Sequence, residues 1–126
     1  MIKYKQKVFG VKGSCFKTCV ACLMNVSLSE VPNFILRGPD WFRHCHNWFA
    51  RRGYDIYITT YKKELHSKKK LIIVGGRSPR YDCGHAVIYY AGKPYHDPHP
   101  DNTFIVGEPT HVYVIKRNRN AKIWTR

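Results

Sequence analysis

The sequence predicts an α+β protein in which N-terminal helices pack on a curled antiparallel sheet. Apolar residues recur at helical spacing as far as about residue 52, and the pattern becomes extended after Gly53. A chain of 126 residues suffices for one hydrophobic core, so we expect a single domain over residues 1–126. With 44% hydrophobic residues and no low-complexity segment, the composition indicates a folded chain throughout.

The chain is strongly basic, with a net charge of +14 from 22 Lys and Arg against 8 Asp and Glu. A charge of this size favours anionic partners or an acidic protein surface. The basic residues gather in two clusters that form either a partner-binding patch or a solvated loop and a frayed tail: Lys62, Lys63, Lys68, Lys69 and Lys70, and then Lys116, Arg117, Arg119, Lys122 and Arg126.

Targeting signals and cysteine usage both favour a cytoplasmic protein. The first ten residues lack the apolar region of a signal peptide, and no apolar run approaches the roughly 18 residues of a membrane helix. We therefore expect no membrane partner. The five cysteines are an odd number, and three of them lie between Cys15 and Cys22, which suits free thiols in a reducing compartment.

The first helix is expected to begin near Cys15. Gly13 provides a turn and Ser14 an N-cap, and the apolar residues that follow recur at helical spacing. A further helical turn is expected where Ser27 can cap the segment that ends at Glu30. The apolar face of the first helix contains Phe16, Cys19, Val20, Leu23 and Met24.

A second helix is predicted from about Asp40 to Arg52, with Asp40 as its cap and Gly53 as its end. Its apolar stripe is Trp41, Phe42, Cys45, Trp48 and Phe49. Four segments rich in Ile, Val, Tyr and Thr follow and should form one antiparallel sheet: 54–61, 71–74, 85–91 and 111–116. A hairpin turn at residues 91–93 is expected to lead into a short strand at 94–96, which delivers Asp97.

Three residues from distant segments have the types that thiol chemistry requires. Cys15 opens a helix, where the dipole and the unpaired backbone N–H groups stabilise a thiolate. A nucleophilic cysteine needs a histidine to share its proton and a third group to orient that histidine. His85 begins an apolar strand, and antiparallel pairing with the next strand can bring Asp97 beside it.

These motifs resemble the papain-like cysteine peptidase superfamily, especially its minimal members akin to bacteriocin-leader peptidases. The similarity rests on Gly-Ser-Cys15 at a helix start, Gly-His85-Ala-Val on a strand and His-Asp97-Pro after a hairpin, in the chain order Cys, His, Asp. The run from Gly13 to Cys19, with residues 31–34, 78–80 and 96–100, is also similar to small uncharacterised bacteriophage proteins. That second similarity spans most of the chain.

The resemblance implies a papain-like core and a cysteine-dependent hydrolase, a protease or an isopeptidase/amidase that uses an acyl-enzyme intermediate and no cofactor. Cys15 would be the nucleophile, His85 the base and then the acid, and Asp97 the group that orients His85. The Cys15 backbone N–H and the Gln6 side chain would bind the oxyanion. His99 and His96 are candidates for substrate contact or for a substitute base. The basic surface favours an acidic protein or peptide substrate.

The alternative function is a phage-encoded binding or inhibitor protein on the same scaffold. Its basic face would bind a host defence factor or nucleic acid, and the protein would then act in the host cytoplasm. The small size and the charge of +14 favour this alternative.

Two kinds of metal site would use the same cysteines and histidines, and the sequence argues against both. The spacing Cys15-x3-Cys19-x2-Cys22 matches an iron–sulfur signature of radical enzymes, but these enzymes need a barrel too large for this chain. Zinc ligand types occur in three clusters without a recognised ligand spacing. These clusters are 44–46, 83–85 and 96–99.

Overall fold

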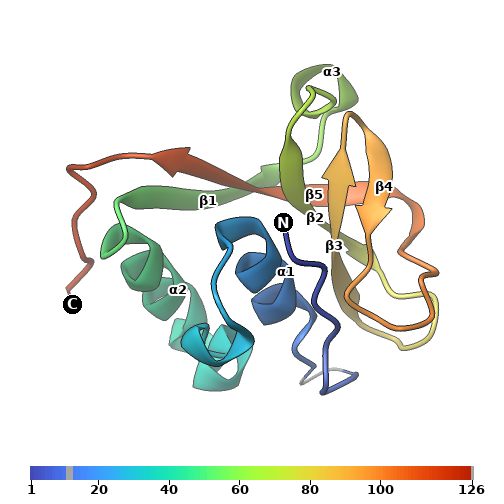
Figure 1. Cartoon of the computed structure of the whole chain (residues 1–126), viewed down its shortest axis with the longest axis horizontal. Helices are drawn as coiled ribbons and strands as arrows, with labels where there is room; N and C mark the ends of the chain where they lie inside the picture. The colour runs from blue at the N-terminus through green and yellow to red at the C-terminus, as the bar shows by residue number, and fades with distance from the viewer. Residues whose placement is uncertain (11–12, 126) are drawn as a thin grey trace.

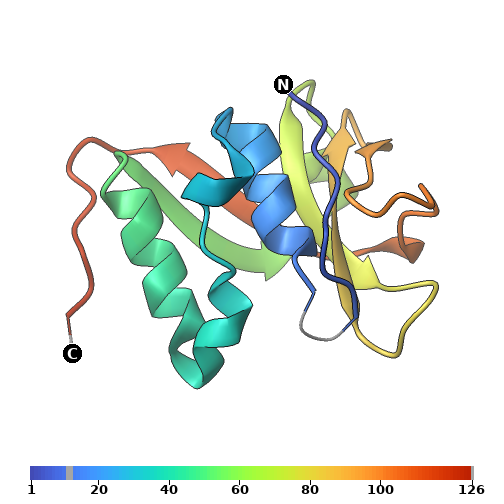
Figure 2. The ribbon, with the colours of Figure 1, turned by 60° about the horizontal axis from the view of Figure 1, so that its bottom comes forward.

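A five-stranded antiparallel sheet and the helices that cover one of its faces make up the protein (Figures 1 and 2). This computed structural model describes residues 1–10 and 13–125. The strand order is β1-β5-β2-β3-β4, and every neighbouring pair is antiparallel. The predicted α+β class with an antiparallel sheet is therefore confirmed. The strands are β1 (Tyr54–Thr60), β2 (Leu71–Arg77), β3 (Gly84–Tyr90), β4 (Lys93–His96) and β5 (Val106–Arg117).

The helices occupy the N-terminal part of the chain, as the sequence pattern predicts. They are α1 (Cys15–Met24) and α2 (Trp41–Ala50), with the short 3-10 helices η1 (Leu28–Glu30) and η2 (Phe34–Asp40) between them. Both α1 and α2 lie against the same face of the sheet (Figure 2). One turn of helix that the sequence pattern did not predict, α3 (Lys63–His66), lies between β1 and β2.

The core has two parts, one on each face of the sheet. Between the sheet and the helices lie buried apolar side chains from α1, α2 and alternate strand positions, including Phe16, Phe49 and Ile73. Neighbouring strand positions such as Val74 and Val87 point to the opposite face and form a second, smaller cluster. β2 and β3 are buried on both faces of the sheet, and this burial fixes the position of His85 near the start of β3.

None of the three expected helix caps is formed. Ser27 precedes η1, but its hydroxyl makes no cap bond and instead donates to Glu30 Oε1 at 3.2 Å. Ser14 precedes α1, but its hydroxyl makes no cap bond and instead interacts with the backbone of Val8. Asp40 precedes α2, and its carboxylate pairs with the Arg43 guanidinium rather than with the helix N-terminus. Other backbone and side-chain partners therefore replace the capping bonds that the sequence pattern favours.

The turns that end α2 and join β3 to β4 follow the sequence prediction. Gly53, in the turn that follows α2, has φ of 81°, a conformation that glycine adopts without a steric penalty. Ala91 and Gly92 have φ of 52° and 78°, which are the two positive values of a type I′ hairpin. This tight turn sets the pairing of β3 with β4, and β4 ends one residue before Asp97.

The C-terminal segment is held against α2, so the expectation of a frayed tail is wrong as far as Trp124. The Asn47 side chain accepts the Trp124 N–H at 2.7 Å and donates to the Trp124 carbonyl at 3.1 Å. The His46 ring stacks on the Trp124 indole, with ring centroids 3.5 Å apart. The basic residue Arg126 lies outside the described residues.

Over residues 1–10 and 13–125, no single helix has the length and apolar composition to cross a membrane. One pair of helical segments, Cys15–Met24 and Leu28–Ala50, has this length and composition only when the two are taken together, and it is bent by 113°.

Candidate active site

Cys15 is the first residue of α1 and is partly exposed. Its Sγ accepts a hydrogen bond from the backbone N–H of Ala86 at 3.4 Å. Ala86 follows His85 on β3, so this bond joins the start of α1 to the strand that carries the histidine. An N–H group aimed at sulfur stabilises negative charge there and adds to the effect of the helix N-terminus.

His85 and Asp97 form the closest charged contact in this region. His85 Nε2 lies 2.7 Å from Asp97 Oδ1, and the two side chains are 5% and 0% exposed. The hairpin between β3 and β4 brings them together because β4 pairs back along β3 as far as His96, which lies opposite Ile88, and Asp97 is the next residue. The structure therefore places Asp97 beside His85, where the sequence predicted it.

Asp97 is held by more than His85. Its Oδ1 also accepts the backbone N–H of His99 at 2.9 Å, and its Oδ2 accepts the N–H of Phe104 at 2.8 Å. Burial alone would raise the pKa of Asp97, but hydrogen bonds from His85 and from these two N–H groups outweigh burial and lower it. The carboxyl group is therefore ionised at neutral pH and acts only as an acceptor.

The ionised partner sets the charge and the orientation of His85. Burial alone would lower the pKa of His85, but hydrogen bonds to Asp97 and to Cys15, with the charges of both groups, raise it to about 9. Because Asp97 accepts from Nε2, Nδ1 is left to exchange a proton with the thiol. At neutral pH the imidazole carries a positive charge next to the sulfur.

The N-terminal segment supports the loop that carries Asp97, which the sequence pattern did not reveal. Lys5 Nζ donates to the Asp97 carbonyl at 2.9 Å, to the His99 carbonyl at 3.3 Å and to Asn102 Oδ1 at 2.6 Å. The Gln6 N–H donates to the Pro98 carbonyl at 2.8 Å. No motif identifies Lys5, because its partners are mainly backbone carbonyls about 90 residues away in the chain.

Gln6 lies near the N-terminus of α1, and its side-chain amide already donates a hydrogen bond to the backbone. Gln6 Nε2 donates to the Val8 carbonyl at 2.8 Å, and the same carbonyl accepts the Ser14 N–H at 2.9 Å. Gln6 Oε1 is buried without a hydrogen-bond partner. The Gln6 amide therefore shares the Val8 carbonyl with Ser14, the residue before Cys15. Its N–H donor is directed at Val8 and not at the thiol.

The two histidines near Asp97 have different surroundings. His96 Nε2 lies 2.6 Å from the Tyr4 carbonyl, which fixes its ring to the N-terminal segment. His99 Nδ1 accepts the Asp101 N–H at 3.0 Å, and its ring centroid is 6.4 Å from that of His85. Burial, with the charge of Arg80, lowers the pKa of His99. Burial likewise lowers the pKa of His96. Only His99 adjoins the His85 ring.

The remaining cysteines are poorer nucleophiles by their environment. All five cysteines are free thiols. Cys19 and Cys22 are buried in the core, as predicted, and so is Cys45. Burial raises the pKa of each of these three thiols. The pKa of the partly exposed Cys83 is also raised, first by burial and then by the nearby Cys15 and Asp82.

The candidate zinc ligands do not converge. Over the residues that the structure describes, no group of three or more His, Cys, Asp or Glu side chains is arranged to hold a metal ion. On α2, Cys45 is buried in the core and His46 stacks on Trp124. His44 instead lies 3.9 Å from the Asp40 carboxylate.

Two hollows are lined by residues next to the site in the chain, although Cys15, His85 and Asp97 line neither, and basic residues line both. One, of about 420 Å³, includes Lys7, Ser14 and Lys17 in its lining. The other, of about 430 Å³, is lined by Val106 and by the loop that precedes β3, with Arg77 and Arg80. Asp82, in the second hollow, is the one acidic residue among the lining residues of the two.

The chain was compared with models of protein families, with curated proteins and with solved structures, and none of the three comparisons found a match.

Proposed function

We propose that the protein is a cysteine-dependent hydrolase of amide bonds with a papain-like core, in which Cys15, His85 and Asp97 act as the triad. The contact of 2.7 Å between His85 Nε2 and Asp97 Oδ1, with the Cys15 thiol next to the same imidazole, is the observation that carries this proposal. The arrangement of α1 against a sheet whose β3 starts with the histidine supports the papain-like core.

The proposed reaction has two steps. The Cys15 thiolate attacks the carbonyl carbon of the substrate, and the C–N bond breaks as the His85 imidazolium gives its proton to the leaving amine. Water then gives a proton to His85 and attacks the thioester, the C–S bond breaks, the carboxylic acid product leaves, and the thiolate and imidazolium of the starting state are restored. Asp97 orients the imidazole and stabilises its charge throughout.

The oxyanion would be stabilised by the Cys15 backbone N–H at the start of α1. Gln6 would add a second donor if its side-chain N–H gave up its hydrogen bond to the Val8 carbonyl and donated to the substrate oxygen instead. Acidic peptides are the proposed substrates, because Lys7 and Lys17 line one of the two hollows and Arg77 and Arg80 the other.

The direct test is cleavage of a pool of synthetic peptides, both acidic and basic, followed by mass spectrometry. We expect the acidic peptides to be cleaved, and we expect Cys15→Ala and His85→Ala to abolish cleavage while circular dichroism shows that the fold persists. Cys83→Ser is the matched control, because it removes the other partly exposed thiol and should keep activity. Cleavage that persists in Cys15→Ala would exclude the proposal.

A further inference from the structure

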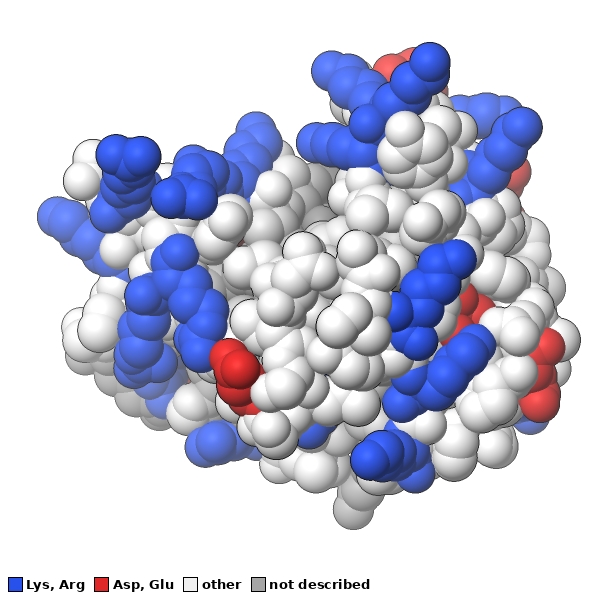
Figure 3. Space-filling view, in the orientation of Figure 1, with Lys and Arg blue, Asp and Glu red and all other residues white. Residues whose placement is uncertain are grey.

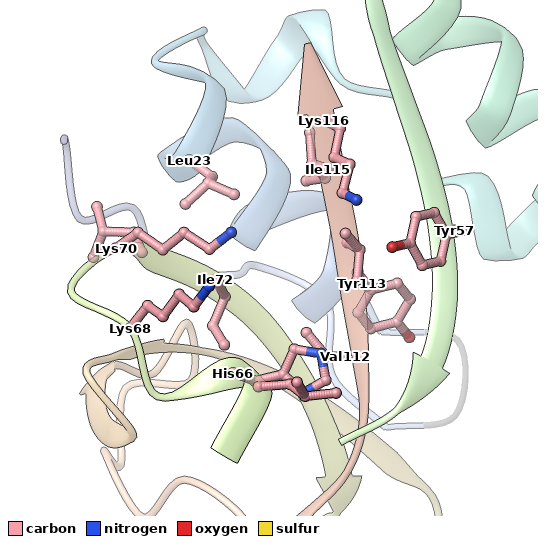
Figure 4. Close-up of a pocket in the computed structure, with 13 residues that line it drawn as sticks. Leu23, Tyr57, His66, Lys68, Lys70, Ile72, Val112, Tyr113, Ile115 and Lys116 are labelled. Atoms are coloured by element: carbon pink, nitrogen blue, oxygen red, sulfur yellow. The ribbon is translucent and has the colours of Figure 1, made fainter. Parts of the chain in front are cut away.

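The sheet opens into a groove on the side of β5 away from β1. The pairing of β2 with β5 begins at Ile73 and Tyr113, so Leu71 and Ile72 at the start of β2 are not paired with β5. Beyond Tyr113, β5 pairs with β1 alone. A groove of about 320 Å³ fills the space between the diverging strands. Its apolar lining includes Leu23, from the end of α1, and Ile115 (Figure 4).

Positive charge converges on this groove from two parts of the chain. Lys68 and Lys70 follow α3, and their ammonium groups point into the groove, while Lys116 reaches it from β5 (Figure 4). No Asp or Glu is among its lining residues. Figure 3 shows Lys and Arg side chains over both lobes of the molecule that flank this hollow. The fold thus brings two lysines of the first basic cluster and one of the second to a single cavity.

An aromatic ring lies beside these lysines. Tyr57, on the edge strand β1, lines the groove and is 43% exposed. Lys116 Nζ lies 5.7 Å from the centre of its ring. Single-stranded nucleic acids are bound by this combination of cations for the phosphates and an exposed ring on which a base stacks.

We propose that this groove binds single-stranded nucleic acid, with one base against Tyr57 and the adjoining phosphates on Lys68, Lys70 and Lys116. The cavity volume is at the lower end of the range of roughly 300–1,000 Å³ that small-ligand sites occupy, which suits one nucleotide of a longer strand. Binding here does not depend on the proposed hydrolase, because Cys15 is not among the groove residues.

The test measures the fluorescence anisotropy of labelled oligo-dT and oligo-U, each about 12 nucleotides long, and of a duplex of the same length. The variant Lys68→Glu/Lys70→Glu removes charge from the groove. Lys3→Glu/Lys93→Glu is the matched control, with the same change in net charge at exposed residues that do not line the groove. Tyr57→Ala removes the ring, and Tyr57→Phe keeps it. Circular dichroism checks the fold of each variant.

We expect Lys68→Glu/Lys70→Glu to weaken single-strand binding at least tenfold and to reduce the slope of log affinity against log salt by about 1.4, from roughly 2 for three phosphate contacts. The Lys3/Lys93 control should lose much less. Tyr57→Ala should weaken single-strand binding about tenfold and leave duplex binding unchanged, and Tyr57→Phe should bind normally. A preference for oligo-dT or oligo-U would identify the natural strand as DNA or RNA.

Three results would overturn the proposal. The first is absence of single-strand binding at low salt, and the second is an equal loss of affinity in the two lysine double variants. The third is tighter binding of a polyglutamate peptide than of either oligonucleotide, which would assign the groove to an acidic protein segment instead.

Discussion

His85 Nε2 and Asp97 Oδ1 lie 2.7 Å apart in a part of the protein from which solvent is almost excluded. Asp97 accepts three hydrogen bonds there, from the imidazole and from the backbone N–H groups of His99 and Phe104. A buried carboxylate with this many donors keeps its charge, and the charge in turn keeps a proton on the imidazole. The reactivity predicted for Cys15 depends on this pair.

Selective labelling of Cys15 is the first expected outcome. At about pH 6 iodoacetamide should modify Cys15 first, because the imidazolium of His85 and the Ala86 N–H stabilise its thiolate, whereas burial raises the pKa of Cys19, Cys22 and Cys45. Peptide mapping by mass spectrometry gives the rate for each thiol.

The His85→Ala variant should lose this preference by about tenfold or more, and His44→Ala, which changes a histidine on α2, should not. Equal labelling of Cys15 and Cys83 in the unmodified protein would contradict the expected thiolate.

The titration of His85 is the second expected outcome. Its pKa should lie at about 9 in the native protein and should fall in Asp97→Asn, because the variant removes the negative charge that holds the proton. NMR of the imidazole Cε1–H groups follows each histidine separately. His111 serves as an internal control, because burial lowers its pKa and it should remain neutral at pH 7 in both proteins. A midpoint near 6.5 for His85 would show that the ion pair does not form.

The dependence of stability on pH gives a third expected outcome. Folding raises the pKa of His85 from 6.5 to about 9, so its contribution is fully present below pH 6.5 and is lost as the pH rises through 9. The free energy of unfolding should therefore fall by about 1–3 kcal/mol over this range.

Denaturant titrations at several pH values measure this slope. Ionisation of the buried cysteines in the unfolded chain adds to it above about pH 8, so the relevant quantity is the difference between the native protein and Asp97→Asn, in which the cysteines are the same. If the difference in free energy of unfolding between the native protein and Asp97→Asn does not change with pH, the charged pair of His85 and Asp97 is not the cause of the pH dependence.

Lys5 should be required for the geometry of the site. Lys5→Met keeps the aliphatic part of the side chain but removes the ammonium group that binds the carbonyls of Asp97 and His99. We expect Cys15 labelling at about pH 6 to slow severalfold and the protein to lose about 1–3 kcal/mol of stability. Lys3→Met is the matched control, because Lys3 is exposed and contacts the Tyr95 ring. Unchanged labelling in Lys5→Met would remove Lys5 from the support of the site.

The local pattern of the sequence determined most of the elements of this fold. Periodicity located α1, α2 and the strands, and the pair Ala91-Gly92 located the hairpin, because these features depend on residues near in the chain. The same local reasoning identified Cys15 at a helix start and placed Asp97 beside His85, since one hairpin joins their strands.

Only the tertiary structure decided which groups surround these residues. The hydrogen bond from Ala86 to Cys15, the contacts of Lys5 and the occupied amide of Gln6 join segments, or use backbone groups, that carry no signal in the sequence. The groove also exists only because β2 and β5 diverge and bring Lys68 and Lys116 to one cavity. Periodicity reports how each segment buries its own apolar face, and it contains no information about which distant backbone donors and charges packing brings together.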